Sequence, residues 1–249
     1  LLPWLVLGVV AGLGTAWLES AQIGASGDGF TLGVVERGLL AGRVVWFYLG
    51  KLLWPAGLTF FYPRWTIDAT VAWQWLFPVA ALLVLAGLVW WRQRDRAPLA
   101  AALLFGGMLF PVLGFVNVYP FVFSYVADHF QYLASVGLVA FFTAAATRGF
   151  ALLRWPRWSG PATAAGVLAI LGGLTWRQSG MYRDVFTLYE TTLARNPSSW
   201  VAHLNLGTAL DSFEIDTGRY PTSDEGLRAL MEAPASAKDW KGPYLKRTV

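Results

Sequence analysis

The chain contains no cysteine among its 249 residues. This absence excludes disulfide bonds, thiol catalysis and thiolate metal sites, and it carries no information about the cellular compartment. Charged residues are also scarce, at 14% of the chain, whereas soluble domains usually carry about 25%. The shortage of charge indicates a membrane protein.

Several functional motifs are missing as well. The sequence has no glycine-rich phosphate loop, no nucleophile elbow and no paired-carboxylate motif. His203 has no second ligand at metal-binding spacing, so we expect no metal ion and no cofactor. The formal net charge is only +4, and the basic residues lie in loops rather than on one face, so we expect no nucleic-acid partner.

Long apolar stretches are what the sequence does contain. Residues 70–91 include no charged side chain, and as a helix they would extend roughly 33 Å, enough to cross the hydrocarbon layer. Tryptophans gather at the ends of such stretches, as they do in the headgroup belt. The fold class predicted is an all-α polytopic membrane protein with five spans, at residues 1–18, 70–91, 98–118, 132–147 and 161–176.

Arginine-rich connectors predict the orientation of these spans. Arginines occur at 92, 94 and 96 after the second span and at 148, 154 and 157 after the fourth. Positive loops remain cytoplasmic, so residues 118–131 and the C-terminus are expected in the periplasm of a multi-pass bacterial inner-membrane protein. Residues 1–18 lack a basic leader and a good small-residue cleavage site, so they do not resemble a signal peptide. No initiator methionine is present, so we expect the chain to begin inside a longer protein.

The first external segment, residues 19–69, contains an amphipathic stretch at 34–61. Arg43, Phe47 and Lys51 are spaced four apart, so a helix would place both cations on one side. This pattern favours a helix that lies in the headgroup plane or re-enters partway. The alternative is a true span in which Lys51 snorkels to the interface.

The composition becomes that of a soluble protein after Trp176. Helical spacing predicts one helix at 182–195, which Asn196 and Pro197 end, and a second at 200–215. A turn follows at 217–221, a short helix is predicted at 224–231, and residues 240–245 are expected to be extended or irregular. The predicted domains are therefore a membrane region at 1–176, repeat-like helices at 177–207 and a last segment at 208–249.

Four motifs in the first 207 residues resemble a known family. They are residues 46–55 (WFYLGKLLWP), 61–65 (FYPRW), 127–135 (ADHFQYLAS) and 182–184 (YRD). Together they resemble the C-terminal membrane half of bacterial tetratricopeptide-repeat proteins related to O-mannosyltransferases, which are glycosyltransferases of the GT-C type. Residues 196–207 resemble the end of one repeat helix and the start of the next.

This resemblance implies transfer of a sugar from a polyprenyl-phosphate donor at the outer membrane face. The family's catalytic acid lies in the first external loop of the full-length protein, and no such acidic motif occurs upstream of Asp128. We therefore expect a catalytically incomplete glycosyltransferase fragment that binds a polyprenyl-phosphate glycolipid and membrane lipids. The catalytic residue is unknown.

Two groups of residues are candidates for that binding site. Asp128 and His129, with Gln131 and Tyr132 beside them, lie where charge at a membrane boundary must be hydrated, paired or used. They would hold the donor phosphate and orient a sugar hydroxyl or a cation. The alternative for Asp128 is the N-cap of a helix in a hydrated loop end.

The second group is cationic. Arg43, Lys51 and Arg64 would meet a lipid-linked phosphate at the membrane surface, since arginine forks and lysine charges both recognise phosphate. The alternative is ordinary snorkelling toward anionic lipids.

The last part of the chain resembles a different family. Its motifs are residues 209–211 (ALD), 216–222 (DTGRYPT), 225–227 (EGL), 229–230 (AL), 233–234 (AP) and 240–245 (WKGPYL). They strongly resemble the major pseudopilin, protein G, of type II secretion.

In that family this stretch is the end of a long helix, a loop and the start of a small sheet, so a truncated α+β segment is implied. The resemblance gives an alternative function, that of a pseudopilin-like structural component anchored in the inner membrane, with pseudopilus or other periplasmic proteins as partners. The change of family near residue 207 fits a gene fusion, a misassembled sequence or a designed chimera, and we leave these three open.

Overall fold

The computed structural model describes residues 10, 12, 14, 15, 17, 18 and 31–245. All regular structure in residues 31–245 is helical, which confirms the predicted all-α class. These residues contain no strand, so the pseudopilin-like segment holds no part of a sheet within the described range. The span predicted at residues 1–18 lies largely outside the described residues.

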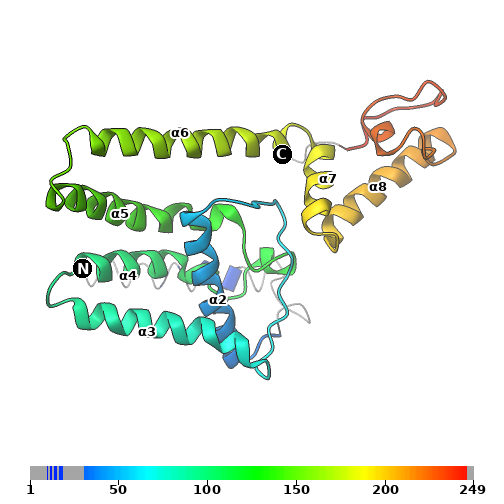
Figure 1. Cartoon of the computed structure of the whole chain (residues 1–249). Coiled ribbons are helices and arrows are strands. Elements are labelled where there is room, and N and C mark those ends of the chain that lie inside the picture. Colours follow the sequence, from blue (N-terminus) through cyan, green and yellow to red (C-terminus); the bar gives the residue numbers. More distant parts are fainter. Residues whose placement is uncertain (1–9, 11, 13, 16, 19–30, 246–249) are drawn as a thin grey trace. The chain divides into compact units, whose positions relative to one another are not determined.

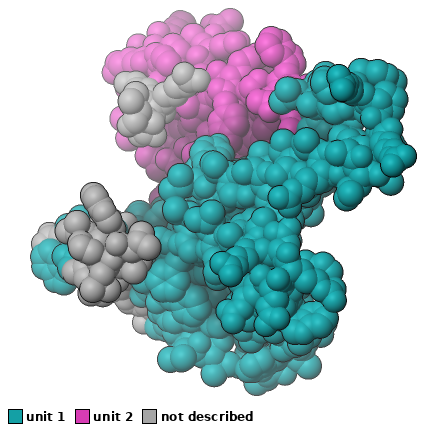
Figure 2. Space-filling view, turned by 90° about the vertical axis from the view of Figure 1, so that its left-hand side faces the viewer, with its two compact units in different colours: residues 1–56, 64–170 teal, residues 57–63, 171–249 magenta. Residues whose placement is uncertain are grey.

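The chain divides into two compact units, which Figure 2 colours separately. Unit 1 comprises residues 1–56 and 64–170, and unit 2 comprises residues 57–63 and 171–249. The three predicted domains, 1–176, 177–207 and 208–249, remain a prediction.

Unit 1 is built from α-helices joined by short 3-10 turns. Its helices are α2 (Val34–Leu53), α3 (Leu76–Trp91), α4 (Ala97–Leu109), α5 (Tyr132–Leu152) and the first half of α6 (Ser159–Ser179). The 3-10 turns are η3 (Ala72–Trp75), η4 (Phe110–Val112), η5 (Tyr119–Val122) and η6 (Asp128–Gln131). Helix α4 packs against α5, and α2 packs against α3. Figure 1 shows α2 running across α3 and α4 rather than alongside them.

Two helical stretches among the described residues are long and apolar enough to cross a membrane. They are Ala72–Trp91, formed by η3 and α3, and Asp128–Leu152, formed by η6 and α5. No residue of α3 is buried, and Leu82 and Leu83 are each about two-thirds exposed. Such an exposed apolar surface is costly in water and favourable in lipid.

The other predicted spans have less support. Helix α4 ends at Leu109 instead of continuing to residue 118, because Pro111 follows in η4 and Gly114 turns the chain at φ 100°. At 13 residues, α4 extends about 20 Å, less than the roughly 30 Å of a hydrocarbon core. Helix α6 has 21 residues but is not among the stretches that are apolar enough. A count of five spans therefore stays a prediction.

The helices of unit 2 begin and end where local chemistry requires. Helix α7 covers Val185–Arg195, and the Asp184 carboxylate caps it by accepting the Thr187 backbone N–H at 2.7 Å. Helix α8 covers Trp200–Thr217 and ends at Gly218, whose φ of 73° suits glycine. The helix predicted at 224–231 is only a 3-10 turn, η8 (Leu227–Leu230), and η7 (Gly180–Tyr182) precedes α7.

The core of unit 2 joins α8 to the chain that follows it. Its buried members are Leu206, Ala209, Phe213, Ala229, Leu230 and Leu245. Phe213 and Leu230 are completely buried, and α7 contributes partly buried residues around them. The core therefore anchors residues 227–245 to α8 although these residues form no sheet.

Candidate functional site

Helix α2 approaches α3 closely at Gly42. A Cβ atom at this position would lie only 2.5 Å from the Pro78 backbone nitrogen and 2.6 Å from its Cα atom. Nearby, the Trp46 indole N–H donates to the Phe77 carbonyl at 3.0 Å. Gly42 and Trp46 thus both contribute to the close packing of α2 against the start of α3.

This crossing places Arg43 among aromatic rings. Its guanidinium carbon lies 4.2 Å from the centroid of Trp65, 5.5 Å from that of Trp73 and 5.9 Å from that of Phe77. These distances are within the range of cation–π attraction. Phe47, one turn along α2, packs edge-on against Trp65. We call Trp65, Trp73 and Phe77 the aromatic platform.

The two other predicted cations have partners of their own. The Lys51 ammonium donates to the Ala56 carbonyl at 2.6 Å. Arg64 donates to the Tyr125 hydroxyl at 3.1 Å, and its guanidinium stacks over that ring at 4.9 Å. Arg64 and Tyr125 line an open depression of about 310 Å³, together with Thr31, Leu32, Trp65, Thr66 and Ile67. The three predicted cations therefore have different partners, although Trp65 contacts Arg43 and also lines the depression beside Arg64.

The predicted group at 128–132 is also divided. Asp128 is the first residue of η6, whose N-cap is Ala127, so the alternative of an Asp128 N-cap is wrong. The His129 ring packs against Phe130 at 4.6 Å. The Gln131 side-chain oxygen is buried and has no hydrogen-bond partner among residues 31–245, whereas Tyr132 is 70% exposed. Gln131 and Tyr132 thus differ in environment instead of lining one site.

Two residues that sequence reasoning did not identify hold this region together. The fully buried Tyr48 hydroxyl donates to the Ala127 carbonyl at 3.2 Å and accepts the Ala127 N–H at 3.1 Å. Arg37 donates to the Gly114 carbonyl at 2.7 Å and to the Asn117 side-chain oxygen at 2.8 Å. Both contacts join positions nearly 80 residues apart. Helical periodicity relates only residues on adjacent turns, so it could not predict these contacts.

A second candidate region is the polar network of unit 2. Arg219 forms two hydrogen bonds of 2.7 Å with the Glu225 carboxylate, which also accepts the Thr222 N–H at 2.8 Å and the Ser236 hydroxyl. This bidentate arrangement is the strongest type of arginine–carboxylate contact. The arginine donors and the other contacts hold the pKa of Glu225 well below its usual range.

A second ion pair links residues 241–244 to the end of α8. The Asp216 carboxylate accepts from the Lys241 ammonium and from the Tyr244 hydroxyl, both at 3.0 Å. The hydrogen bond from Lys241 is the main reason why the pKa of Asp216 is lowered. Hydrogen bonds to Glu214 and Asp211 raise the pKa of Tyr220 to about 12. Acidic side chains in this region therefore serve as anchors for the loop after α8.

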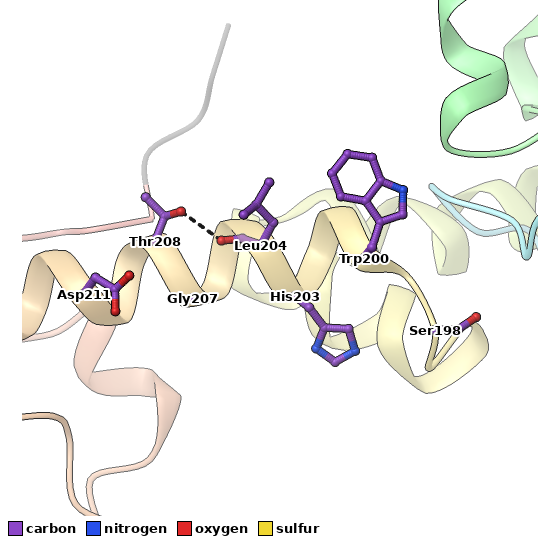
Figure 3. Close-up of a pocket in the computed structure, with 7 residues that line it drawn as sticks. All are labelled: Ser198, Trp200, His203, Leu204, Gly207, Thr208 and Asp211. Carbon is purple, nitrogen blue, oxygen red and sulfur yellow. Dashed lines mark hydrogen bonds between the residues drawn. The ribbon is translucent and has the colours of Figure 1, made fainter. Parts of the chain in front are cut away.

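The outer side of α8 carries a shallow groove of about 620 Å³. Figure 3 shows Trp200, Leu204 and Thr208 projecting from one side of the helix, whereas His203 points away from them. His203 is fixed by a hydrogen bond of 2.8 Å between its Nε2 atom and the Pro197 carbonyl. No group of three or more potential metal ligands occurs in the described part of the chain, and His203 here has a structural contact.

Part of the chain matches a known protein family. Residues 192–249 match the family model of the type II secretion system (T2SS), protein G. No curated protein and no solved structure matches the chain. The match supports the pseudopilin resemblance and extends it upstream of the predicted boundary at residue 208, into α7.

The protein G match contains both ion-pair networks and the core of unit 2. The motifs quoted for the resemblance supply Arg219, Glu225 and Tyr244, which the structure shows in contact with their partners. The glycosyltransferase and tetratricopeptide resemblances of residues 1–207 have no support from these comparisons. The glycolipid site at Arg43, Lys51, Arg64, Asp128, His129, Gln131 and Tyr132 stays a prediction.

The network around Glu225 gives a prediction about pH. The carboxylate has a lower pKa in the folded protein than its ordinary value of 4.5, so its ionised form stabilises the fold above that pH. Stability is lost as the pH falls below about 4.5 toward the depressed pKa. Hydrogen-exchange protection of peptides from 213–245 in the full chain should therefore decrease progressively with acidification.

Replacing Glu225 with glutamine should lower this protection at neutral pH and flatten its pH dependence. Glu232→Gln is the matched control, because Glu232 is exposed and takes no part in the network. Equal pH profiles for Glu225→Gln and the unmodified chain would contradict the assignment.

Proposed function

We propose that this chain is a membrane-anchored structural component of a type II secretion apparatus. Its C-terminal segment, residues 192–249, would act as a protein G-like module, and the apolar helices of unit 1 would anchor it. The single observation that carries the proposal is the family match to residues 192–249. The alternative function proposed from the sequence is thus favoured over glycosyltransfer.

The structure of unit 2 supports this proposal. A segment of about 60 residues that lacked a core would be difficult to keep folded. Here Phe213 and Leu230 are fully buried, and the Trp240 indole N–H donates to the Ala229 carbonyl at 2.8 Å. The segment therefore has the packing needed to present a defined surface, even without a strand in its described residues.

The two membrane-length helices support the location. A secretion component of this kind would be fixed in the bacterial inner membrane, with unit 2 on the periplasmic side where its partners assemble. Ala72–Trp91 and Asp128–Leu152 are suited by length and composition to that anchoring role. The partners we infer are pseudopilus subunits.

Site-directed crosslinking in cells tests this function. The chain has no cysteine, so a single introduced cysteine carries a photoreactive maleimide at one known position. Ile215→Cys places it on α8, where Ile215 is 81% exposed. Co-expression with type II secretion protein G should give a crosslinked product that contains both chains.

The matched control is Leu152→Cys, at a position 84% exposed at the end of α5. It should give no product with protein G. Equal labelling from both positions, or a product from Ile215→Cys that contains only this chain, would rule out the proposed association.

A further inference from the structure

Aromatic rings contact the planar face of the Arg43 guanidinium, whereas its N–H groups point outward along the edge of that plane. Trp65 lies against it at 4.2 Å, and Trp73 and Phe77 lie further around it. No hydrogen bond or ion pair within residues 31–245 occupies its N–H groups. An arginine has five such donors in a planar fork, so the aromatic platform orients a cation whose N–H donors have no partner within residues 31–245.

Neighbouring cations do not share this property. Lys51 donates to the Ala56 carbonyl and Arg64 donates to the Tyr125 hydroxyl. Arg37 donates to several acceptors, among them the Leu32 carbonyl at 3.1 Å and the Gly114 carbonyl at 2.7 Å. Arg43 is therefore the cation on α2 that is most fully arranged for a ligand from outside the chain.

The position of the platform indicates which ligand is within reach. Trp73 and Phe77 belong to the first turns of the membrane-length stretch Ala72–Trp91. Trp73 and Trp75 are 50% and 43% exposed, as expected for rings in the headgroup belt. Since α2 crosses this end of α3 (Figure 1), a bilayer spanned by Ala72–Trp91 would have its headgroup layer near Arg43.

We propose that Arg43 binds the phosphate group of a membrane lipid, using its edge N–H donors while the aromatic platform holds its face. A planar arginine fork matches two phosphate oxygens, and stacking on tryptophan limits the side-chain entropy lost on binding. The site lies entirely in unit 1 and does not depend on the function proposed for unit 2. The helix α2 would then be anchored in the headgroup layer by a defined lipid contact.

Native mass spectrometry of the full chain, released from nanodiscs into detergent, tests the proposal. Phosphatidylglycerol and phosphatidylcholine with the same acyl chains are supplied in equal amounts, and the retained lipids are counted. Arg43→Gln should reduce retained phosphatidylglycerol about tenfold, the loss expected for one charge-assisted contact. Arg43→Lys should reduce it less, because lysine keeps the charge without the fork.

Arg183→Gln is the matched control for loss of one positive charge, because Arg183 lies in unit 2 and its side chain is 86% exposed. It should change phosphatidylglycerol retention less than twofold. Equal retention by Arg43→Gln and Arg183→Gln would overturn the proposal.

A measurement on the unmodified chain removes the dependence on folding of the variants. A phosphatidylglycerol with a photoreactive headgroup should label peptides from 34–53 or 64–77, and failure to label either peptide would overturn the site. Separate titrations with a long-chain polyprenyl phosphate and with inorganic phosphate distinguish the sources of the phosphate. Competition by the polyprenyl phosphate supports the proposal, whereas competition by inorganic phosphate alone shows an adventitious ion only and contradicts it.

Discussion

Replacement of Gly42 by alanine should separate α2 from α3 and lower the free energy of unfolding by about 3 kcal/mol. The added methyl group would lie 2.5–2.8 Å from three atoms of Pro78, two of which belong to the backbone. A backbone contact cannot be relieved by a rotamer change, so the helix itself must move. The Trp46 hydrogen bond to Phe77 and the stacking of Arg43 on its platform should be lost with it.

Thermal unfolding of the full chain in detergent measures this effect. A loss of about 3 kcal/mol corresponds to a decrease in Tm of about 10 °C for a chain of this size. Gly38→Ala is the matched control in the same helix, since a Cβ atom at Gly38 meets nothing within 4 Å. That variant should gain roughly 0.5–1 kcal/mol from the higher helix propensity of alanine. Equal Tm values for the two variants would show that the close approach at Gly42 is unimportant.

The second large effect is expected from Arg37→Met. This change removes the donors to the Gly114 carbonyl and the Asn117 side chain, at 2.7 and 2.8 Å, and leaves those acceptors without a charged partner. Charge-assisted hydrogen bonds contribute about 1.5–3 kcal/mol each, so a total loss near 3 kcal/mol is expected after partial hydration of the loop. Hydrogen exchange in peptides from 110–120 should increase more than exchange in α5.

Arg148→Gln provides the comparison. Arg148 also forms an ion pair, 3.2 Å from Asp95, but its side chain is 72% exposed, and exposed pairs contribute less than about 1 kcal/mol. The Tm of Arg148→Gln should therefore remain close to that of the unmodified chain. A decrease as large as that of Arg37→Met would mean that charge alone, and not the partly buried carbonyl contacts, explains the effect.

The sequence predicted the elements of the fold better than their contacts. The length of the apolar runs predicted α3 and α5. The spacing of four residues between Arg43, Phe47 and Lys51 predicted a helix where the structure has α2. These signals are local, because helical periodicity is a property of adjacent turns. Pro111 and Gly114 could have indicated the early end of α4. The prediction extended the helix to residue 118 because the residues up to that point are mostly apolar.

The candidate site was less predictable because its geometry depends on distant pairs. Arg43 was recognised as a cation, yet its stacking on Trp65 and Trp73 requires that the segment between α2 and α3 fold back onto α2. Likewise, Arg219 and Glu225 were part of a recognised motif, but the bidentate contact between them needs the turn at Gly218. The residue types indicated which side chains could bind a phosphate or form an ion pair, and only the tertiary structure showed which residues contact them.

Helix α8 passes without a break through residues 207 and 208, where the two resemblances meet. Its inward positions, Ala202, Leu206, Ala209 and Phe213, continue the same stripe on both sides of that point. One residue added or removed there would rotate everything downstream by about 100° and turn Phe213 toward solvent. The angular phase of α8 at these two residues therefore decides whether its C-terminal half can bury its apolar side chains, so a change of helix length here is tolerated only in steps that restore that phase.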